Sequence, residues 1–147
     1  MDVKKAFTDI INSGRWKMGD TICGHGSQTK CTTKYLINLK KLIIKYNIKS
    51  ILDCGCGDLN HVSSLFDFFR ENNISYTGCD IVDSIIETNK KKFPDIDFVC
   101  DDIKNINKQV DLVICREVLF HLPIDHIKHF FEKMKTNNWR MEIFREP

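Results

Sequence analysis

The sequence predicts an α/β fold, in which a mostly parallel sheet lies between two layers of helices. Strand and helix patterns alternate from residue 50 onward, which is typical of βαβ units. The strands are near-continuous apolar runs, as expected when helices cover both faces of a parallel sheet. A length of 147 residues favours a single domain over residues 1–147. Within it we expect N-terminal helices and a glycine-rich loop over 1–47 and the sheet core over 48–147.

The composition is that of an ordinary globular protein, with 42% hydrophobic and 29% charged residues. No apolar run approaches the roughly 20 residues that a membrane-spanning helix needs, so we expect no membrane partner. The first five residues open an amphipathic stretch rather than the apolar segment of a signal peptide. Seven cysteines in a chain with no export signal are typical of reduced thiols, which predicts a cytoplasmic protein.

The net charge of +2 hides an uneven distribution. Residues 1–49 contain ten basic and three acidic residues, an excess that suits an anionic substrate or a nucleic acid. The lysines are spaced, however, and no aromatic residues interleave with them. We therefore favour a solvated helix face over a nucleic-acid partner.

The N-terminal third is predicted to hold two amphipathic helices on either side of a loop. Apolar residues recur at helical spacing over residues 3–11 and again over 32–46. Four of the seven glycines fall between residues 13 and 27, which indicates unusual backbone angles there. The buried stripe expected for the second helix consists of Leu36, Leu39, Ile43 and Tyr46.

Four strands and three further helices are predicted after residue 47 from apolar runs and their spacing. The expected strands are residues 49–54, 74–80, 96–100 and 110–115. The expected helices are residues 61–71, 81–93 and 123–135. Right-handed crossovers then give the strand order 3-2-1-4, and residues 139–145 are a candidate fifth strand beside the fourth.

A carboxylate or a charged pair follows each of the four strands. These groups are Asp53 with Asp58, Asp80, Asp101 with Asp102, and Arg116 with Glu117. Because parallel strands end at one edge of the sheet, where α/β ligands bind, we expect these side chains to surround a site. Gly55 and Gly57 allow a tight turn that a ligand approaches closely. Asp80, 23 positions past Gly57, is placed to accept from both hydroxyls of a ribose.

These segments resemble the motifs of the class I S-adenosylmethionine-dependent methyltransferases, a Rossmann-like family, over about residues 48–135. The family's first motif, second strand, adenine-contacting segment and fourth strand with its loop are similar to residues 51–58, 76–81, 98–103 and 111–122. Residues 24–27 look like the glycine- and serine-rich entry loop of one bacterial and viral subgroup.

The resemblance implies the cosubstrate S-adenosyl-L-methionine, the product S-adenosyl-L-homocysteine and methyl transfer to an unidentified acceptor. It implies that Asp53 faces the ammonium of the methionine moiety, that Asp80 binds the ribose, and that Asp102, in preference to Asp101, accepts from the adenine amino group. The full set of cosubstrate-binding residues that it implies is Asp53, Gly55, Cys56, Gly57, Asp80, Ile81, Asp102, Ile103, Arg116, Gly26 and Ser27.

His121 and Glu117 are the candidate catalytic residues, because both follow the fourth strand beside the expected acceptor position. An imidazole with a pKa of about 6.5 is able to take a proton from an oxygen or nitrogen nucleophile. The alternative for His121 is a hydrogen bond that orders its own loop. His126 and His129 are expected at the surface of the last helix.

The cysteines are expected to pack in the core rather than to bind a metal. No Cys-x-x-Cys pair is present, as zinc sites commonly have. Cys54, Cys79, Cys100 and Cys115 stand at strand ends, where a small apolar residue packs well.

The sequence departs from the family pattern in two places. Leu59 replaces the third glycine of the first motif, and the last two strands of a complete domain are not apparent. We therefore expect a short or truncated relative, with an edge that favours a homodimer through Leu112–Cys115, residues 124–134 or residues 139–144. The alternative function is a catalytically weak or inactive binding module. A dinucleotide-dependent oxidoreductase is disfavoured, because residues 58–60 interrupt the Gly-x-Gly-x-x-Gly pattern.

Overall fold

The computed structural model describes residues 2–137 and 139–142, which include a five-stranded sheet. The strands are β1 (Ser50–Cys54), β2 (Ser75–Asp80), β3 (Asp97–Cys100), β4 (Leu112–Ile114) and β5 (Arg140–Glu142). Their order is β3-β2-β1-β4-β5, and every neighbouring pair is parallel. The predicted strand order is confirmed, with the fifth strand beside the fourth. Residues 143–145 of the predicted fifth strand lie outside the described residues.

β1 is the central strand, and it is buried on both faces. Successive side chains of a strand point to opposite faces, and Ile51 and Leu52 accordingly pack in two different core clusters. β4 repeats the pattern, with Leu112 in the cluster of Ile51 and Val113 in the cluster of Leu52. A strand that is apolar on both faces needs a covering layer on each.

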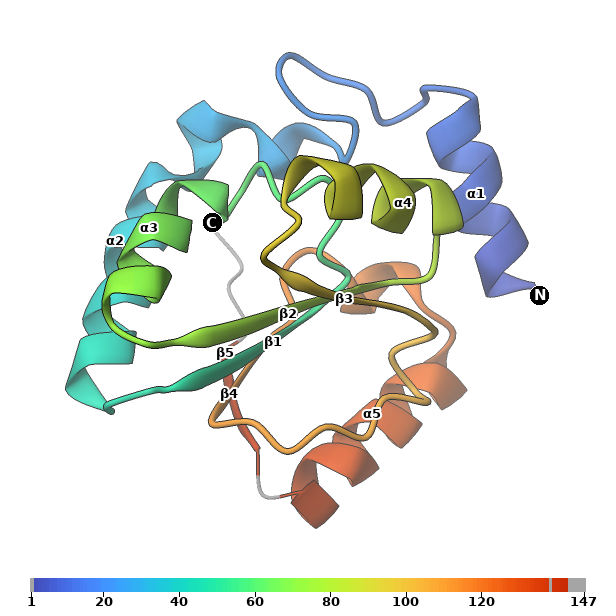
Figure 1. Cartoon of the computed structure of the whole chain (residues 1–147). Helices are drawn as coiled ribbons and strands as arrows, with labels where there is room; N and C mark the ends of the chain where they lie inside the picture. The colour runs from blue at the N-terminus through green and yellow to red at the C-terminus, as the bar shows by residue number, and fades with distance from the viewer. Residues whose placement is uncertain (1, 138, 143–147) are drawn as a thin grey trace.

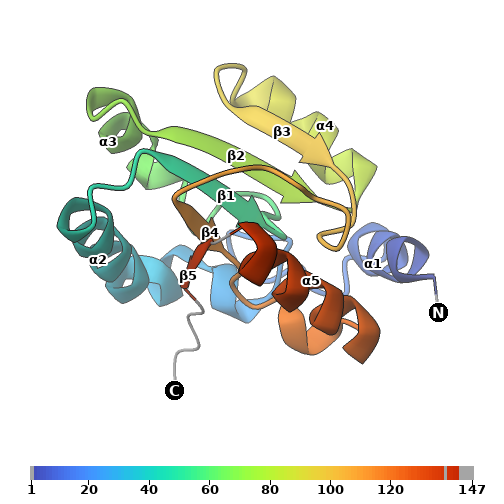
Figure 2. The same cartoon turned by 90° about the horizontal axis from the view of Figure 1, so that it is seen from below.

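The two layers of helices are unequal. The helices are α1 (Val3–Asn12), α2 (Thr29–Lys45), α3 (Phe66–Glu71), α4 (Asp83–Lys92) and α5 (Ile124–Asn137). α2, α3 and α4 cover one face of the sheet, whereas α5 covers the other (Figure 1 and Figure 2). Leu39, Phe69 and Ile86 pack in the first layer, and Phe130 packs in the second. The predicted three-layer α/β/α arrangement is confirmed.

The connection from β3 to β4, residues 101–111, contains no helix. Ile103 and Ile106 of this connection pack in the layer of α5 and cover part of the sheet there. β3 stays partly uncovered, with Val99 38% exposed, although its apolar run predicts a buried strand. The alternation of strand and helix is therefore interrupted after β3.

α1 and the glycine-rich loop after it close over the carboxyl ends of the strands instead of extending the sheet. Asp2 caps α1 by accepting from the backbone N–H of Lys5 at 3.0 Å. Lys4 forms an exposed ion pair of 2.7 Å with Asp83, and Figure 1 shows α1 next to α4. The glycine-rich loop, which contains a short 3₁₀ turn at His25–Ser27, joins α1 to α2.

The helix predicted over residues 61–71 is wrong in its first half. Residues 63–65 form a 3₁₀ turn, and α3 begins only at Phe66. Leu59 has a φ of +62° and a fully buried side chain, and a left-handed residue interrupts a right-handed helix. Packing the leucine side chain in the core offsets this backbone strain. The turn leaves His61 outside the helix, with its ring directed toward Asp53.

Two further predictions are corrected by the packing of α2 and β4. The buried face of α2 contains Tyr35, whereas Tyr46 lies beyond the helix end and is 45% exposed. Leu112–Cys115 is not an association edge, because β5 pairs with β4 and these residues are buried. None of the helices within residues 2–137 is long and apolar enough to span a membrane.

Candidate functional site

A cavity lies at the carboxyl ends of the strands, between the sheet, α1 and the glycine-rich loop. The space between its walls amounts to about 820 Å³, part of which is open solvent. Most of the predicted site residues line it, namely Gly55, Cys56, Gly57, Asp80, Ile81, Asp102, Ile103, Arg116, Glu117, His121 and Ser27. Asp53 and Gly26 are not among the described residues that line this cavity.

The turn after β1 brings bare backbone to the cavity. The N–H groups of Gly55 and Cys56 donate to the carbonyl of Cys79 at 2.8 and 2.9 Å, which holds the turn against β2. Gly55 and Gly57 have φ values of +79° and +54°. A Cβ atom at Gly57 would lie 2.6 Å from the sulfur of Cys23. Glycine is therefore required here both for the backbone angle and for the space.

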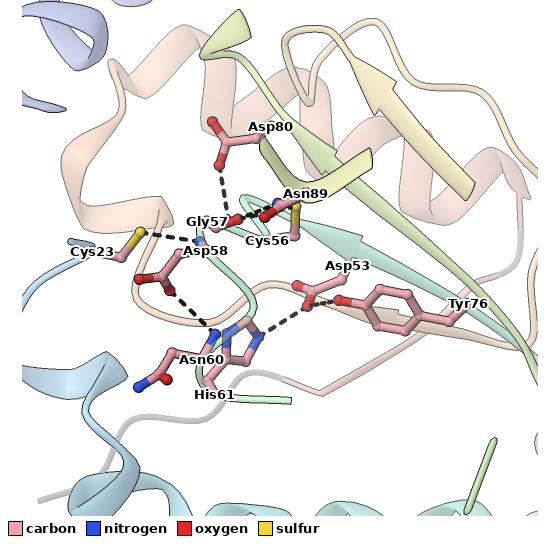
Figure 3. A network of polar contacts seen from close by, with 10 residues as sticks. All are labelled: Cys23, Asp53, Cys56, Gly57, Asp58, Asn60, His61, Tyr76, Asp80 and Asn89. Atoms are coloured by element: carbon pink, nitrogen blue, oxygen red, sulfur yellow. Dashed lines mark hydrogen bonds and ion pairs between the residues drawn. The ribbon is translucent and has the colours of Figure 1, made fainter. Parts of the chain in front are cut away.

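Asp80 ends β2 with its carboxylate beside this turn, as Figure 3 shows. Its Oδ2 accepts from the N–H of Gly57 and its Oδ1 from the N–H of Val82, each at 3.0 Å. Asn89 donates to the carbonyl of Gly57 at 2.7 Å, so the turn is held from both sides. Burial raises the pKa of Asp80, and the backbone hydrogen bonds oppose this shift. Each carboxylate oxygen keeps a lone pair for a further donor.

Asp102 lines the cavity and is held from behind by a histidine. Oδ2 of Asp102 lies 3.1 Å from Nδ1 of His126, an electrostatic contact that is not aligned as a hydrogen bond. Nζ of Lys104 lies 3.2 Å from Nε2 of the same ring. Because an ammonium only donates, Nε2 is the acceptor and the proton resides on Nδ1, beside the carboxylate. The predicted surface position of His126 is wrong, since the residue is only 9% exposed.

Asp53 is fully buried, and Figure 3 shows its carboxylate between Tyr76 and His61. Its Oδ2 accepts from the hydroxyl of Tyr76 at 2.5 Å and from Nε2 of His61 at 2.9 Å. Its Oδ1 is buried and has no hydrogen-bond partner among the described residues. Burial, with a further contribution from Asp53, raises the pKa of Tyr76 well above its usual value, so the phenol keeps its proton. His61 lines the cavity, and its ring therefore stands between the cavity and the carboxylate.

Arg116 follows β4 and places a buried guanidinium at the cavity. Its Nη2 donates to the carbonyl of Gly26 at 2.8 Å, and its Cζ lies 5.1 Å from the ring centre of Tyr35. Its Nε is buried without a hydrogen-bond partner in the described part of the chain. Gly26 thus contacts Arg116 instead of lining the cavity itself.

Aromatic side chains surround His121 on the α1 side of the cavity. The ring of Trp16 lies 4.8 Å from that of His121 between centres, and Phe7 packs edge-on at 6.4 Å. Burial lowers the pKa of His121, and the nearby Glu117 opposes this shift. The imidazole is therefore neutral at pH 7 and able to accept a proton. Glu117 itself has a φ of +57°, an uncommon conformation for a residue with a side chain.

Sequence reasoning missed the part of the cavity wall that comes from α1 and His61. Val3, Phe7 and Ile11 line the cavity, and their spacing of four identifies one face of the helix. That spacing does not say which element the face covers. His61 carried a weaker signal, its position eight residues after Asp53 in the same segment.

Comparison with known proteins points to one family. The family model described as "Methyltransferase domain" matches residues 51–137. The curated proteins contain no match to this chain.

Several solved structures similar to this chain are described as methyltransferases. The magnesium protoporphyrin IX methyltransferase of Synechocystis PCC 6803, solved with bound S-adenosylmethionine, is 18% identical with a TM-score of 0.64, over 92% of this chain and 72% of that one. An S-adenosylmethionine-dependent methyltransferase of Clostridium acetobutylicum is 19% identical with a TM-score of 0.61, over 74% of this chain and 46% of that one. The S-adenosylmethionine-bound amino pentose methyltransferase CalS10 of Micromonospora echinaspora is 15% identical with a TM-score of 0.62, over 100% of this chain and 58% of that one. At these identities the likeness shows the shared fold, and the match spans less than half of the Clostridium protein.

Proposed function

We propose, from the premise that the chain belongs to the methyltransferase-domain family, that it transfers a methyl group from S-adenosylmethionine to an acceptor. The product is then S-adenosylhomocysteine. The observation that carries this proposal is the carboxylate of Asp80, which stands in the cavity beside the bare backbone of Gly57. A buried acid next to a glycine turn at the carboxyl edge of a parallel sheet suits a ribose.

The cavity fits this cosubstrate in charge and in shape. The free lone pairs of Asp80 suit the two ribose hydroxyls, and those of Asp102 suit the adenine amino group. Ile81 offers an apolar surface for one face of the adenine, and the backbone of Ile103 a partner for a ring nitrogen.

Methyl transfer depends mainly on the alignment of the acceptor atom with the methyl group. Methyl transfer is an in-line displacement in which the lone pair of the acceptor forms a bond to carbon while the C–S electron pair returns to sulfur. Holding the two reacting atoms about 3–3.5 Å apart and in line supplies much of the acceleration. An acceptor that is protonated at neutral pH also needs a base, and we assign that role to the neutral imidazole of His121, with Glu117 as the second candidate.

Calorimetry with S-adenosylmethionine, S-adenosylhomocysteine and NAD tests the proposal. We expect both sulfur nucleosides to bind and NAD not to bind. Asp80→Ala should weaken S-adenosylhomocysteine binding by at least about tenfold, because each charge-assisted hydrogen bond contributes about 1.5–3 kcal/mol. Asp83→Ala, which removes an exposed carboxylate three positions later, is the matched control. Binding of neither sulfur nucleoside by the wild-type protein refutes the function.

We also propose that the protein is cytoplasmic and forms a homodimer. All seven cysteines are free, which suits a reducing compartment. Ile124 and Phe131, seven residues apart on α5, are 66% and 37% exposed, and an apolar stripe of this kind suits a second copy. Light scattering should show a dimer for the wild type and a monomer for Ile124→Asp. A wild-type monomer at micromolar concentration contradicts the assembly.

A further inference from the structure

Arg116 is a buried cation for which the described chain supplies no anion. Its side chain is 7% exposed, and no carboxylate within residues 2–137 lies within 4.0 Å of its guanidinium. One donor is used by the carbonyl of Gly26, while Nε is buried and unpaired. Burying a charge without a partner is costly, and a buried guanidinium presents a fork that matches a carboxylate. A ligand carboxylate in the cavity would satisfy it.

His61 presents the opposite chemistry to the same cavity. The carboxylate of Asp53 only accepts, so the hydrogen bond from Nε2 shows that this nitrogen carries a proton. The hydroxyl of Tyr76 donates to the same carboxylate oxygen, which fixes the position of Asp53. No hydrogen bond to Nδ1 is found in the described part of the chain, so this nitrogen is left for a ligand, and in the neutral ring it accepts a hydrogen bond from a donor such as an ammonium.

Both groups contact one ring, that of Tyr35 on α2. The centre of this ring lies 6.2 Å from the ring centre of His61 and 5.1 Å from the guanidinium carbon of Arg116. The cation and the acceptor therefore lie at the same end of the cavity. An α-amino acid group carries a carboxylate and an ammonium on one carbon, which is the pair of charges that this end complements.

We propose that Arg116 and His61 form a clamp for the α-amino-acid group of the cosubstrate, with Arg116 binding its carboxylate and His61 its ammonium. This inference rests on the proposed function. It makes Asp53 and Tyr76 positioning residues that orient the imidazole, whereas the sequence predicts direct contact between Asp53 and the ammonium. The unpaired Oδ1 of Asp53 leaves negative charge behind the ring, which favours a cation in front of it.

Two probes separate this end of the ligand from the rest. S-adenosylhomocysteine contains the amino-acid group, and 5′-methylthioadenosine keeps the adenosine and the sulfur but lacks that group. We would measure the affinity of each variant for both probes by calorimetry and compare the ratio of the two affinities. The ratio does not depend on the folded fraction, so partial unfolding of a variant does not imitate the effect.

Arg116→Gln and His61→Phe should each weaken S-adenosylhomocysteine binding by about tenfold or more, the effect expected for a lost charge-assisted hydrogen bond. Their affinity for 5′-methylthioadenosine should stay within about twofold, since that probe makes no contact with either charge. Tyr76→Phe, which removes one of the two donors to Asp53, should shift the ratio in the same direction by about threefold. Arg70→Gln and His129→Gln, which alter exposed side chains outside the cavity, should leave the ratio unchanged.

The outcomes distinguish the clamp from the function on which it rests. Equal losses for both probes, or no loss for either, in Arg116→Gln and His61→Phe overturn the clamp while wild-type binding of S-adenosylhomocysteine keeps the proposed function. A wild-type protein that binds neither probe overturns both. An unchanged ratio in Tyr76→Phe overturns the positioning role alone.

Discussion

Two aspartate–histidine pairs stand at the cavity, one buried and one partly buried, and they face it in opposite order. In the pair after β1, His61 lines the cavity and Asp53 lies behind it. In the pair after β3, Asp102 lines the cavity and His126 lies behind it. The same two residue types therefore present an imidazole to the ligand at one end of the cavity and a carboxylate at the other.

The difference depends on what each partner in the rear contacts. Tyr76 holds Asp53 from β2, so the carboxylate is fixed in the core and the imidazole is the outer group. Lys104 takes the second nitrogen of His126, so that imidazole has no nitrogen left for a ligand. An aspartate–histidine pair is thus not one functional unit, because the third group decides which member contacts the ligand.

The two pairs should differ most strongly in how much the loss of the aspartate lowers the free energy of unfolding. Asp53→Ala leaves the hydroxyl of Tyr76 and the ring of His61 buried without an acceptor, and we expect a loss of about 3–5 kcal/mol. Asp102→Ala should cost clearly less, because Lys104 is 38% exposed and water replaces its partner. Urea denaturation of both variants measures the difference. Equal losses would contradict the contrast between a core pair and a rim pair.

Asp80 is a carboxylate at the cavity without a histidine partner among the described residues. The pH dependence of ligand binding tests its role. Its pKa is raised by burial, and only the ionised form accepts from both ribose hydroxyls. Binding is therefore complete above the raised pKa and is lost as the pH falls through it, by up to about tenfold per pH unit. Calorimetry of S-adenosylhomocysteine binding between pH 8 and pH 5 should show this loss beginning above the usual range of a carboxyl. Asp80→Asn should bind weakly and without that pH dependence.

His126 should act on adenine recognition alone. His126→Ala removes the group behind Asp102, and we expect S-adenosylhomocysteine to bind about two- to fivefold more weakly, as for one weak electrostatic contact. S-inosylhomocysteine carries a carbonyl in place of the adenine amino group, so its affinity should fall less. His129→Ala, an exposed histidine on the same helix, is the control. The same loss for both nucleosides would show a structural role only.

His121, a histidine without a carboxylate within ion-pair distance among the described residues, should show the smallest effect. Its ring lies 4.8 Å from that of Trp16, and its pKa is lowered by burial. A protonated ring at this distance interacts with the indole, so Trp16 fluorescence should change as the pH falls, with a midpoint below about 6.5. Trp139→Phe removes the second tryptophan signal. A midpoint above 6.5 would contradict the lowered pKa of His121.

The residues that form the first strand, its turn and the acid after the second strand can be recognised from the sequence alone. The apolar run of Ile51–Cys54, the glycine turn after it and the acid at the end of β2 are recognisable because neighbours in sequence act together. Strand order also followed, since βαβ crossovers are right-handed and helices cover both faces. The sequence alone therefore predicts that Asp80 and Asp102 lie at the cavity, and both line it.

Contacts between distant segments were decided only by the tertiary structure. Tyr76 contacts Asp53 across 23 positions, and Lys104 contacts His126 across 22. A periodic pattern shows that a face is apolar, but it does not show which element covers it, as Tyr35 of α2 and Tyr46 just beyond that helix illustrate. Hydrogen-bond partners are set by packing of whole elements, because a buried polar group takes whichever partner the fold brings within reach. For this reason the acids were predictable, and the histidines that complete them were not.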